Sequence, residues 1–278
     1  MGNFGPLSGL ARPRLMGIVN VTADSFSDGG RFLDPANAFE QAESLLDAGA
    51  EILDIGGEST RPGSTNVDEK TELDRVIPLI GRIHARYPGA VISVDTRKAE
   101  VARQAIIAGA SMVNDVSALR FDPAMAEVLA GHPGTRLVLM HMLGEPRTMQ
   151  QNPRYEDVVG EICDFFAERI AFAVDCGISQ DRLLLDPGIG FGKNLEHNLT
   201  LLAQLERFRE FGLPLVVGAS RKRFIDALDP SAPDQRLGGT LSAALLAAWQ
   251  RADILRVHDV QAHRQFFITL QAIATRAG

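Results

Sequence analysis

The chain has 278 residues, 45% of them hydrophobic and 23% charged, and a formal net charge of −7 at pH 7. This balance is typical of a globular protein with a hydrophobic core, and it argues against a broad nucleic-acid-binding surface while permitting a local cationic pocket. No apolar run approaches the roughly 18 residues of a membrane-spanning helix, and the N-terminus lacks the apolar core of a signal peptide.

The two cysteines, Cys163 and Cys176, stand in neither a metal-type nor a redox-type spacing. Reduced cysteines used for packing are typical of proteins kept in a reducing compartment. We therefore expect a cytoplasmic protein that needs no disulfide.

Short apolar runs alternate with longer amphipathic patterns along the whole chain. The expected strands cover 15–19, 51–55, 91–95, 111–115, 136–142, 182–186, 213–218 and 253–258. The expected helices cover 35–48, 69–86, 98–108, 123–130, 156–175, 195–210, 221–228 with 239–250, and 260–276. Nearly continuous apolar strands are typical of a parallel sheet buried on both faces. The pattern favours an α/β fold of the (β/α)₈ TIM-barrel type over an open doubly wound sheet.

The expected barrel is a single domain over 14–278, preceded by an N-terminal extension over 1–13. Polar residues stand at the end of strand after strand of this barrel. They are Asn20, Asp54, Asp95, Asn114 with Asp115, His141, Asp186, and Arg256 with His258. Strand ends that merely meet water would also be polar, but they would not select Asp, Asn and His so often. Because the carboxyl ends of barrel strands share one rim, the pattern predicts a ligand site there.

The glycine-rich stretch DPGIGFGKN (186–194) is similar to a phosphate-binding loop. Pro187 occupies the position of the first Gly of the Walker pattern, and Asn194 follows Lys193 where Ser or Thr is required, so a nucleotide P-loop is excluded. The glycines instead favour a sharp turn beside a flat ligand, on which Phe191 would stack. An ordinary turn with a packed Phe is the alternative.

Two basic motifs follow the last two expected strands. GASRKRF (218–224) opens a helix with three cations, and helix N-termini favour anions. In LRVHDV (255–260), Arg256 and His258 are two residues apart and point to the same side of a strand. Lys222 would join them in a cationic clamp, where barrel enzymes often hold phosphate. A solvated basic turn is the alternative.

The acidic and amide residues of the rim can bind two kinds of ligand. Asp and Asn recognise the N–H and C=O edges of planar heterocycles, whereas a cluster of carboxylates can also bind a divalent metal. A metal cage would need no cationic clamp. The presence of both features favours a ligand with a heterocyclic head and an anionic tail.

Taken together, the motifs of this chain resemble those of dihydropteroate synthase. They are MGIVNVTADSFSDGG (16–30), DIGGESTRPGS (54–64), SVDTRKAEV (93–101), VNDVSAL (113–119), LMHM (139–142), LDPGIGFGKN (185–194), GASRKRF and RVHDV. The resemblance implies a TIM barrel that joins 6-hydroxymethyl-7,8-dihydropterin diphosphate to 4-aminobenzoate, giving 7,8-dihydropteroate and diphosphate in folate synthesis. The family uses Mg²⁺, is usually a homodimer and is the sulfonamide target.

The resemblance also implies roles for individual residues. The implied assignments are Asn20 for Mg²⁺; Asp95, Asn114, Met140, Asp186 and Lys222 for the pterin side; Arg256 and His258 for the diphosphate; Thr60, Arg61, Pro62, Phe26 and Phe191 for aminobenzoate; and Gly218 for substrate binding in general. Asp95 and Lys222 would act in catalysis. Asp54 is expected to be a supporting acid, and the loop after it a cover that excludes water from a reactive carbon.

Two positions depart from the family pattern, and two other functions compete with the synthase. Ala23 stands where Pro is common, and Arg223 where relatives frequently have a Ser that helps hold the aminobenzoate carboxylate.

A pterin-binding methyltransferase that works with a corrinoid protein would have no use for the diphosphate clamp. A non-catalytic paralogue that binds pterin would not need the retained loops.

Overall fold

The computed structural model describes residues 12–22, 35–59 and 66–276. The described strands are β1 (Arg14–Asn20), β2 (Ile52–Gly56), β3 (Val91–Asp95), β4 (Met112–Asp115), β5 (Arg136–Met140), β6 (Leu183–Asp186), β7 (Val216–Val217) and β8 (Ile254–Val257). The described helices are α1 (Pro35–Asp47), α2 (Glu69–Arg86), α3 (Ala99–Ala108), α4 (Met125–Ala130), α5 (Val158–Asp175), α6 (Leu195–Ala203), α7 (Arg223–Leu228), α8 (Leu237–Trp249) and α9 (Val260–Ala274), with 3₁₀ turns η1 (Gln180–Arg182), η2 (Leu205–Phe211) and η3 (Pro233–Gln235).

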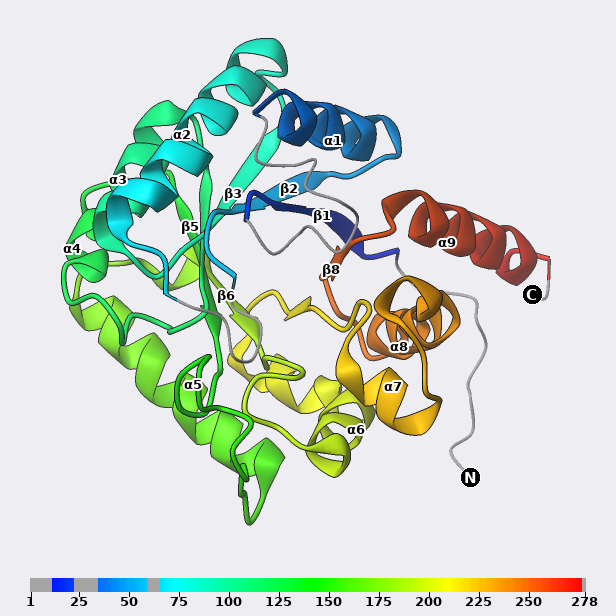
Figure 1. Cartoon of the computed structure of the whole chain (residues 1–278). Helices are drawn as coiled ribbons and strands as arrows, with labels where there is room; N and C mark the ends of the chain where they lie inside the picture. The colour runs from blue at the N-terminus through cyan, green and yellow to red at the C-terminus, as the bar shows by residue number, and fades with distance from the viewer. Residues whose placement is uncertain (1–11, 23–34, 60–65, 277–278) are drawn as a thin grey trace.

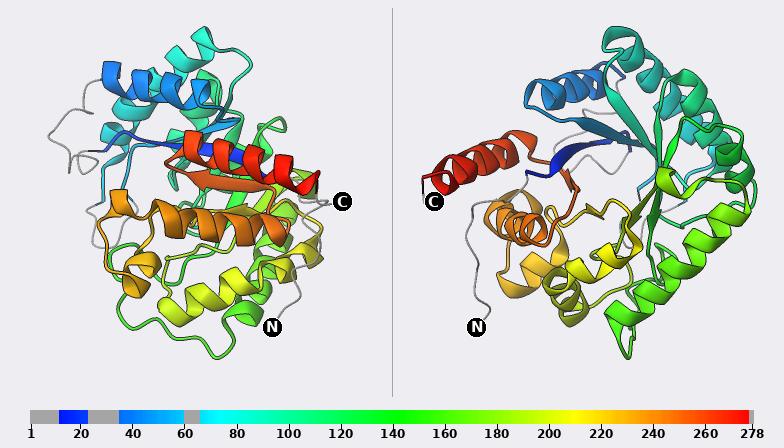
Figure 2. Two further views of the ribbon diagram at one scale, coloured as in Figure 1. Left: turned by 90° about the vertical axis from the view of Figure 1, so that its right-hand side faces the viewer. Right: turned by 180° about the vertical axis from the view of Figure 1, so that it is seen from behind.

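The strands form a central barrel, and the helices lie around its outside (Figure 1; Figure 2). The described part of the chain contains one sheet of parallel strands in the order β6-β5-β4-β3-β2-β1-β8-β7. A bridge between Leu185 and Leu215, with a hydrogen bond of 3.0 Å from Leu185 N to Pro214 O, joins the two edge strands. The barrel is therefore nearly closed, which confirms the TIM-barrel prediction.

Apolar side chains fill the lower part of the barrel interior. This lower layer consists of Met16, Ile52, Met112, Val138, Leu184, Val216 and Ile254, each at most 2% exposed. Because side chains alternate between the two faces of a strand, the residue two positions later points into the same interior, nearer the carboxyl-end rim. That upper layer consists of Ile18, Asp54, Asn114, Met140, Asp186, Gly218 and Arg256. Strand periodicity thus places most of the expected pterin-site residues directly above an apolar floor.

Several expected strands are shorter in the structure, β5 and β7 among them. β5 ends at Met140 instead of residue 142, and β7 is reduced to Val216 and Val217 within the expected 213–218. Pro214 lies in the lost part of β7, and proline has no N–H to donate to a sheet ladder.

The expected helix over 195–210 breaks into α6 and the 3₁₀ turn η2. The side chain of Gln250 lies at the break: its Nε2 donates to Leu202 O at 2.6 Å, and its Oε1 accepts from Glu206 N at 3.2 Å. One amide therefore satisfies backbone groups that a continuous helix would pair internally.

The strand β1 begins at Arg14. Most of the expected extension, residues 1–11, lies outside the described residues, so the extension stays a prediction. Within the described ranges, every helix is too short or too polar to cross a membrane.

Ile52 tests the packing of the lower layer because its side chain is fully buried. Ile52→Ala should lower the free energy of unfolding by about 2–5 kcal/mol, measured by urea denaturation, since the cavity cannot fully collapse. Ile107→Ala in α3 is the control, because Ile107 is 67% exposed. Equal losses in the two variants would contradict a tightly packed barrel interior.

Candidate active site

A buried ionic network lies at the carboxyl-end rim of the barrel. Arg256 donates from Nε to Asp54 Oδ2 at 2.6 Å and from Nη2 to Asp95 Oδ2 at 2.8 Å. Asp54 Oδ2 also accepts from Asn114 Nδ2 at 3.1 Å. The structure therefore brings together four rim residues from β2, β3, β4 and β8, and Asp54 supports two of the others.

The charges of this network are not balanced, because two carboxylates share one guanidinium. Burial raises the pKa of Asp95 to about 7, an effect that Arg256 opposes and Asp54 reinforces. Burial also works against the charge of Arg256, but Asp54 and Asp95 outweigh it and hold the Arg256 pKa above its ordinary value. Asp95 can thus gain or lose a proton near neutral pH, and so donate or accept a hydrogen bond.

Lys222 follows β7 and lies beside Phe191, with Asp186 among the charged groups that act on it. Its Nζ donates to the carbonyl of Ile189 and lies 4.5 Å from the centre of the Phe191 ring. Burial lowers the Lys222 pKa to about 7, with Asp186 opposing the shift. Burial likewise raises the pKa of Asp186, which Lys222 opposes. Lys222 and Asp186 therefore interact electrostatically, and each opposes the pKa shift that burial causes in the other.

Gly218 separates Lys222 from Arg256. A Cβ added at Gly218 would lie 3.7 Å from Arg256 Cβ and 3.9 Å from Lys222 Nζ. The side chains of Arg256 and Lys222 therefore border the same space at the end of β7, and a Cβ at Gly218 would lie in van der Waals contact with both.

The stretch from Asp186 to Asn194 turns sharply, as its glycines predict. Gly188 has φ = 66°, and a Cβ there would lie 1.9 Å from the carbonyl oxygen of His141, so only glycine fits. Asp186 Oδ1 accepts from Gly188 N at 2.8 Å, which fixes the carboxylate at the start of the turn.

The side chain of Lys193 is buried against this turn, and its ammonium group faces protein atoms, so it is not placed to bind a phosphate as a P-loop lysine does. It is 2% exposed, and its Nζ lies 2.9 Å from His141 Nδ1 and 3.0 Å from Phe191 O. Burial lowers the pKa of Lys193 well below its ordinary value, and burial beside Lys193 lowers the pKa of His141 to about 2. His141 is therefore a neutral, buried partner of this lysine.

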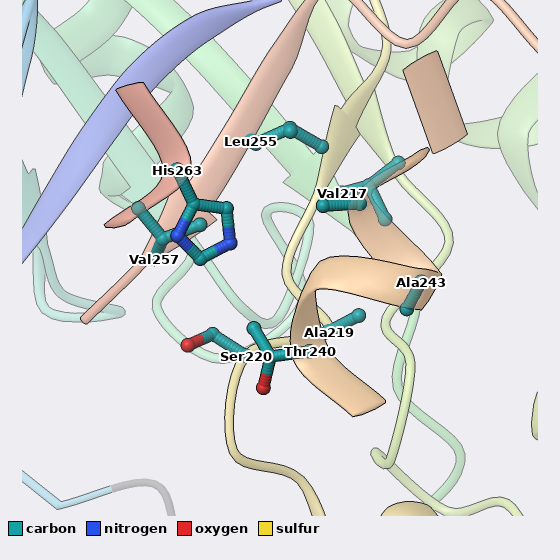
Figure 3. Close-up of a pocket in the computed structure, with 9 residues that line it drawn as sticks. Val217, Ala219, Ser220, Thr240, Ala243, Leu255, Val257 and His263 are labelled. Carbon is teal, nitrogen blue, oxygen red and sulfur yellow. The ribbon is translucent and has the colours of Figure 1, made fainter. Parts of the chain in front are cut away.

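His258 follows β8 and contacts Ser220. Its Nδ1 lies 3.0 Å from Ser220 Oγ, and its backbone N donates to the same oxygen at 3.3 Å. Ser220 in turn lines a small cavity together with Thr240 and His263 (Figure 3). The hydroxyl of Ser220 thus fixes the orientation of the His258 imidazole.

The helix expected from residue 221 begins two residues later, at Arg223. Arg221 has φ = 58°, a left-handed conformation that an α-helix cannot continue, and its guanidinium pairs with Asp259. The cation of Arg221 is therefore committed to Asp259.

Several expected site residues lie outside the described residues: Thr60, Arg61 and Pro62, with Phe26 and the unusual Ala23. Asn20 is the last residue of β1 and is half-buried at the rim. The part of the chain that the structure describes contains no group of three His, Cys, Asp or Glu side chains arranged to hold a metal ion.

Known proteins match this fold and sequence over nearly their whole length. A family model described as "Pterin binding enzyme" matches residues 16–258. The dihydropteroate synthase of Escherichia coli (strain K12) is 49% identical over 252 residues, covering 91% of this chain and 88% of that protein. The Yersinia pestis dihydropteroate synthase with a sulfonamide drug complex has a TM-score of 0.91 at 45% identity, covering 97% of this chain and 96% of that one. The Xanthomonas albilineans dihydropteroate synthase with 4-aminobenzoic acid has a TM-score of 0.88 at 49% identity, covering 95% and 94%.

The lowered pKa of Lys222 predicts a pH-dependent stability. An unfolded lysine keeps its proton up to about pH 10.4, so between about pH 7 and pH 10 the unfolded chain binds more protons than the folded one. The unfolding free energy of the wild type should therefore rise with pH relative to Lys222→Met across this window. Urea titrations of both proteins measure the difference, with Lys70→Met on exposed α2 as the control. A constant difference across the window would contradict the lowered pKa.

Proposed function

The chain belongs to the pterin-binding enzyme family, and we propose that it catalyses the dihydropteroate synthase reaction. That reaction joins 6-hydroxymethyl-7,8-dihydropterin diphosphate to 4-aminobenzoate, so the enzyme is a transferase of folate biosynthesis. The observation that carries the proposal is the upper layer, where acids and amides face one space with Arg256 and Lys222. This combination fits a heterocyclic head with an anionic tail.

The pterin is bound by Asp95, Asn114 and Asp186. A pterin edge presents both N–H donors and C=O or ring-nitrogen acceptors, and carboxylate and amide groups match both kinds. Met140, 3% exposed in the same layer, offers an apolar surface for the flat ring. The lower layer beneath excludes water from this part of the site.

The diphosphate is held at the side of the rim where Lys222, Arg256 and His258 are found. During the reaction the carbon–oxygen bond to diphosphate breaks, the amine nitrogen bonds to that carbon, and the amine loses a proton. Cations fixed beside the leaving group stabilise the negative charge that develops on it. Because Lys222 has a pKa of about 7, an arriving anion also favours its protonated form.

Asp95 stabilises the carbon from which the diphosphate departs. This carbon becomes electron-poor, and a nearby carboxylate lends it negative charge through the pterin. The aminobenzoate amine then needs mainly correct placement, which Phe191 and the residues Thr60, Arg61 and Pro62 provide.

The magnesium ion belongs to the same proposal, with Asn20 as its protein ligand. Mg²⁺ prefers oxygen ligands and is commonly bound by one or two protein groups together with substrate phosphates. The amide of Asn20, at the rim end of β1, fits that donor set. When bound, the ion neutralises charge on the diphosphate.

The proposal also includes a homodimer and a cytoplasmic location. The homodimer rests on the family resemblance, and the location on the free thiols of Cys163 and Cys176. Light scattering coupled to size-exclusion chromatography tests the dimer directly.

Diphosphate release separates the synthase from its two alternatives. Purified protein with Mg²⁺ should release diphosphate from the dihydropterin diphosphate only when 4-aminobenzoate is present, and a sulfonamide should compete with aminobenzoate. Pterin binding without any release would favour the corrinoid-dependent methyltransferase or the non-catalytic paralogue and would contradict the proposal.

Asp95→Asn and Lys222→Ala test the assigned catalytic roles. Each variant should lower turnover about 10²-fold or more, because it removes a charge that acts on the reacting centre. Lys70→Ala on the exposed surface of α2 is the control and should retain full turnover. Near-normal turnover in either active-site variant would disprove its assignment.

A further inference from the structure

Side chains continue the contact between β7 and β8 beyond the point where their backbone ladder ends. Ser220 Oγ lies 3.0 Å from His258 Nδ1, and Arg221 donates from Nε to Asp259 Oδ2 at 2.9 Å. Each of these pairs is 38 positions apart along the chain, the same separation as in the ladder. The side chains therefore keep the register of the two strands up to the rim.

The ion pair of Arg221 and Asp259 is bidentate, because Nε and Nη2 of the guanidinium donate to different oxygens of the carboxylate. The two side chains are 32% and 23% exposed, so water screens the pair only in part. A planar guanidinium on a carboxylate fixes both distance and orientation. Since one charge of each sign is present, the pair contributes geometry to the rim without adding net charge.

The backbone of Arg221 is held by other residues. Its φ is 58°, a left-handed conformation that persists in a residue with a side chain only where the surroundings fix it. Thr240 Oγ1 accepts from Arg221 N at 3.0 Å, and Arg236 Nη1 donates to Arg221 O at 3.1 Å. Thr240 and Arg236 are both buried. The turn therefore does not depend on the Arg221 side chain, which is left to bind Asp259.

The backbone of Asp259 is likewise fixed, in this case to α9. Its carbonyl oxygen accepts from His263 N at 3.1 Å and lies 2.7 Å from Nδ1 of the buried His263 ring. Arg221 precedes Lys222 in the chain, and Asp259 follows His258. The ion pair thus joins the immediate neighbours of two side chains that lie at the diphosphate side of the rim.

We propose that Arg221 and Asp259 are positioning residues for the diphosphate group, because their ion pair sets the spacing between Lys222 and His258. The inference rests on the proposed function, in which Lys222 and His258 hold the diphosphate. Cationic and hydrogen-bonding groups that are already fixed at the correct spacing need not be ordered when the anion binds. Breaking the pair should therefore weaken binding of the diphosphate and leave the pterin contacts as they are.

Asp259→Asn tests this role through the direction of its effect. Removal of a negative charge near an anion would by itself strengthen anion binding. Loss of the bidentate pair should instead weaken it, because an Asn amide accepts through one oxygen only. We expect the dissociation constant of the dihydropterin diphosphate, measured by calorimetry with Mg²⁺, to rise about fivefold in Asp259→Asn and in Arg221→Met.

The pterin without its diphosphate provides the reference ligand. The dissociation constant of 6-hydroxymethyl-7,8-dihydropterin should change less than about twofold in both variants. The double variant should bind the diphosphate substrate about as weakly as either single variant, because each single change already breaks the pair.

Arg209→Met is the matched control. Arg209 pairs with Asp253 at 3.1 Å, with side chains 35% and 41% exposed, at the opposite end of β8. It should leave both dissociation constants unchanged. Asp259→Asn is nearly isosteric, so it keeps the test decisive if Arg221→Met does not fold.

Unchanged or tighter binding of the dihydropterin diphosphate by Asp259→Asn would overturn the inference. Equal losses for the pterin with and without its diphosphate would overturn it as well, since they would indicate general damage to the site. Absence of diphosphate release by the wild type in the presence of aminobenzoate would instead disprove the proposed function, and the binding constants separate that failure from this one.

Discussion

The guanidinium of Arg256 carries one positive charge between two buried carboxylates, those of Asp54 and Asp95. Burying two acids beside one base is unfavourable unless one acid can bind a proton, and the raised pKa of Asp95 reflects that constraint. Removing Asp54 would leave Arg256 with Asp95 alone and would take away the acceptor of Asn114 Nδ2, because one oxygen of Asp54 accepts from both residues. The geometry of the pterin side therefore depends on a residue that need not touch the substrate.

Much of the fold and of this layer could be predicted from the sequence. Continuous apolar strands separated by helical patterns indicated the barrel, which the structure and its relatives confirm. The two-residue period of strands is local, so the positions two residues beyond Met112 and Leu184 had to point inward above the apolar floor. The ordered motifs indicated the family, which the family model confirms.

Contacts between distant residues could not be predicted in the same way. The break after α6 depends on Gln250, and the burial of His141 depends on Lys193, partners that no periodicity connects. The hydrogen bonds from Arg97 to Glu58 and Asn66 were equally hidden, although the acids and bases in the motifs after β2 and β3 indicated that ion pairs could form there. Such contacts are set by how elements pack, and pattern alone contains no packing distances.

The central claim is that the charge pair of Arg256 and Asp54 organises the pterin side of the site. A double-mutant cycle with Arg256→Gln and Asp54→Asn tests it most directly, with the dissociation constant of the dihydropterin diphosphate as the measured quantity. Residues in one ionic network couple by about 0.5–3 kcal/mol, so the double variant should lose much less affinity than the sum of the two single losses. Additive losses would show that the two residues act independently and would contradict the account.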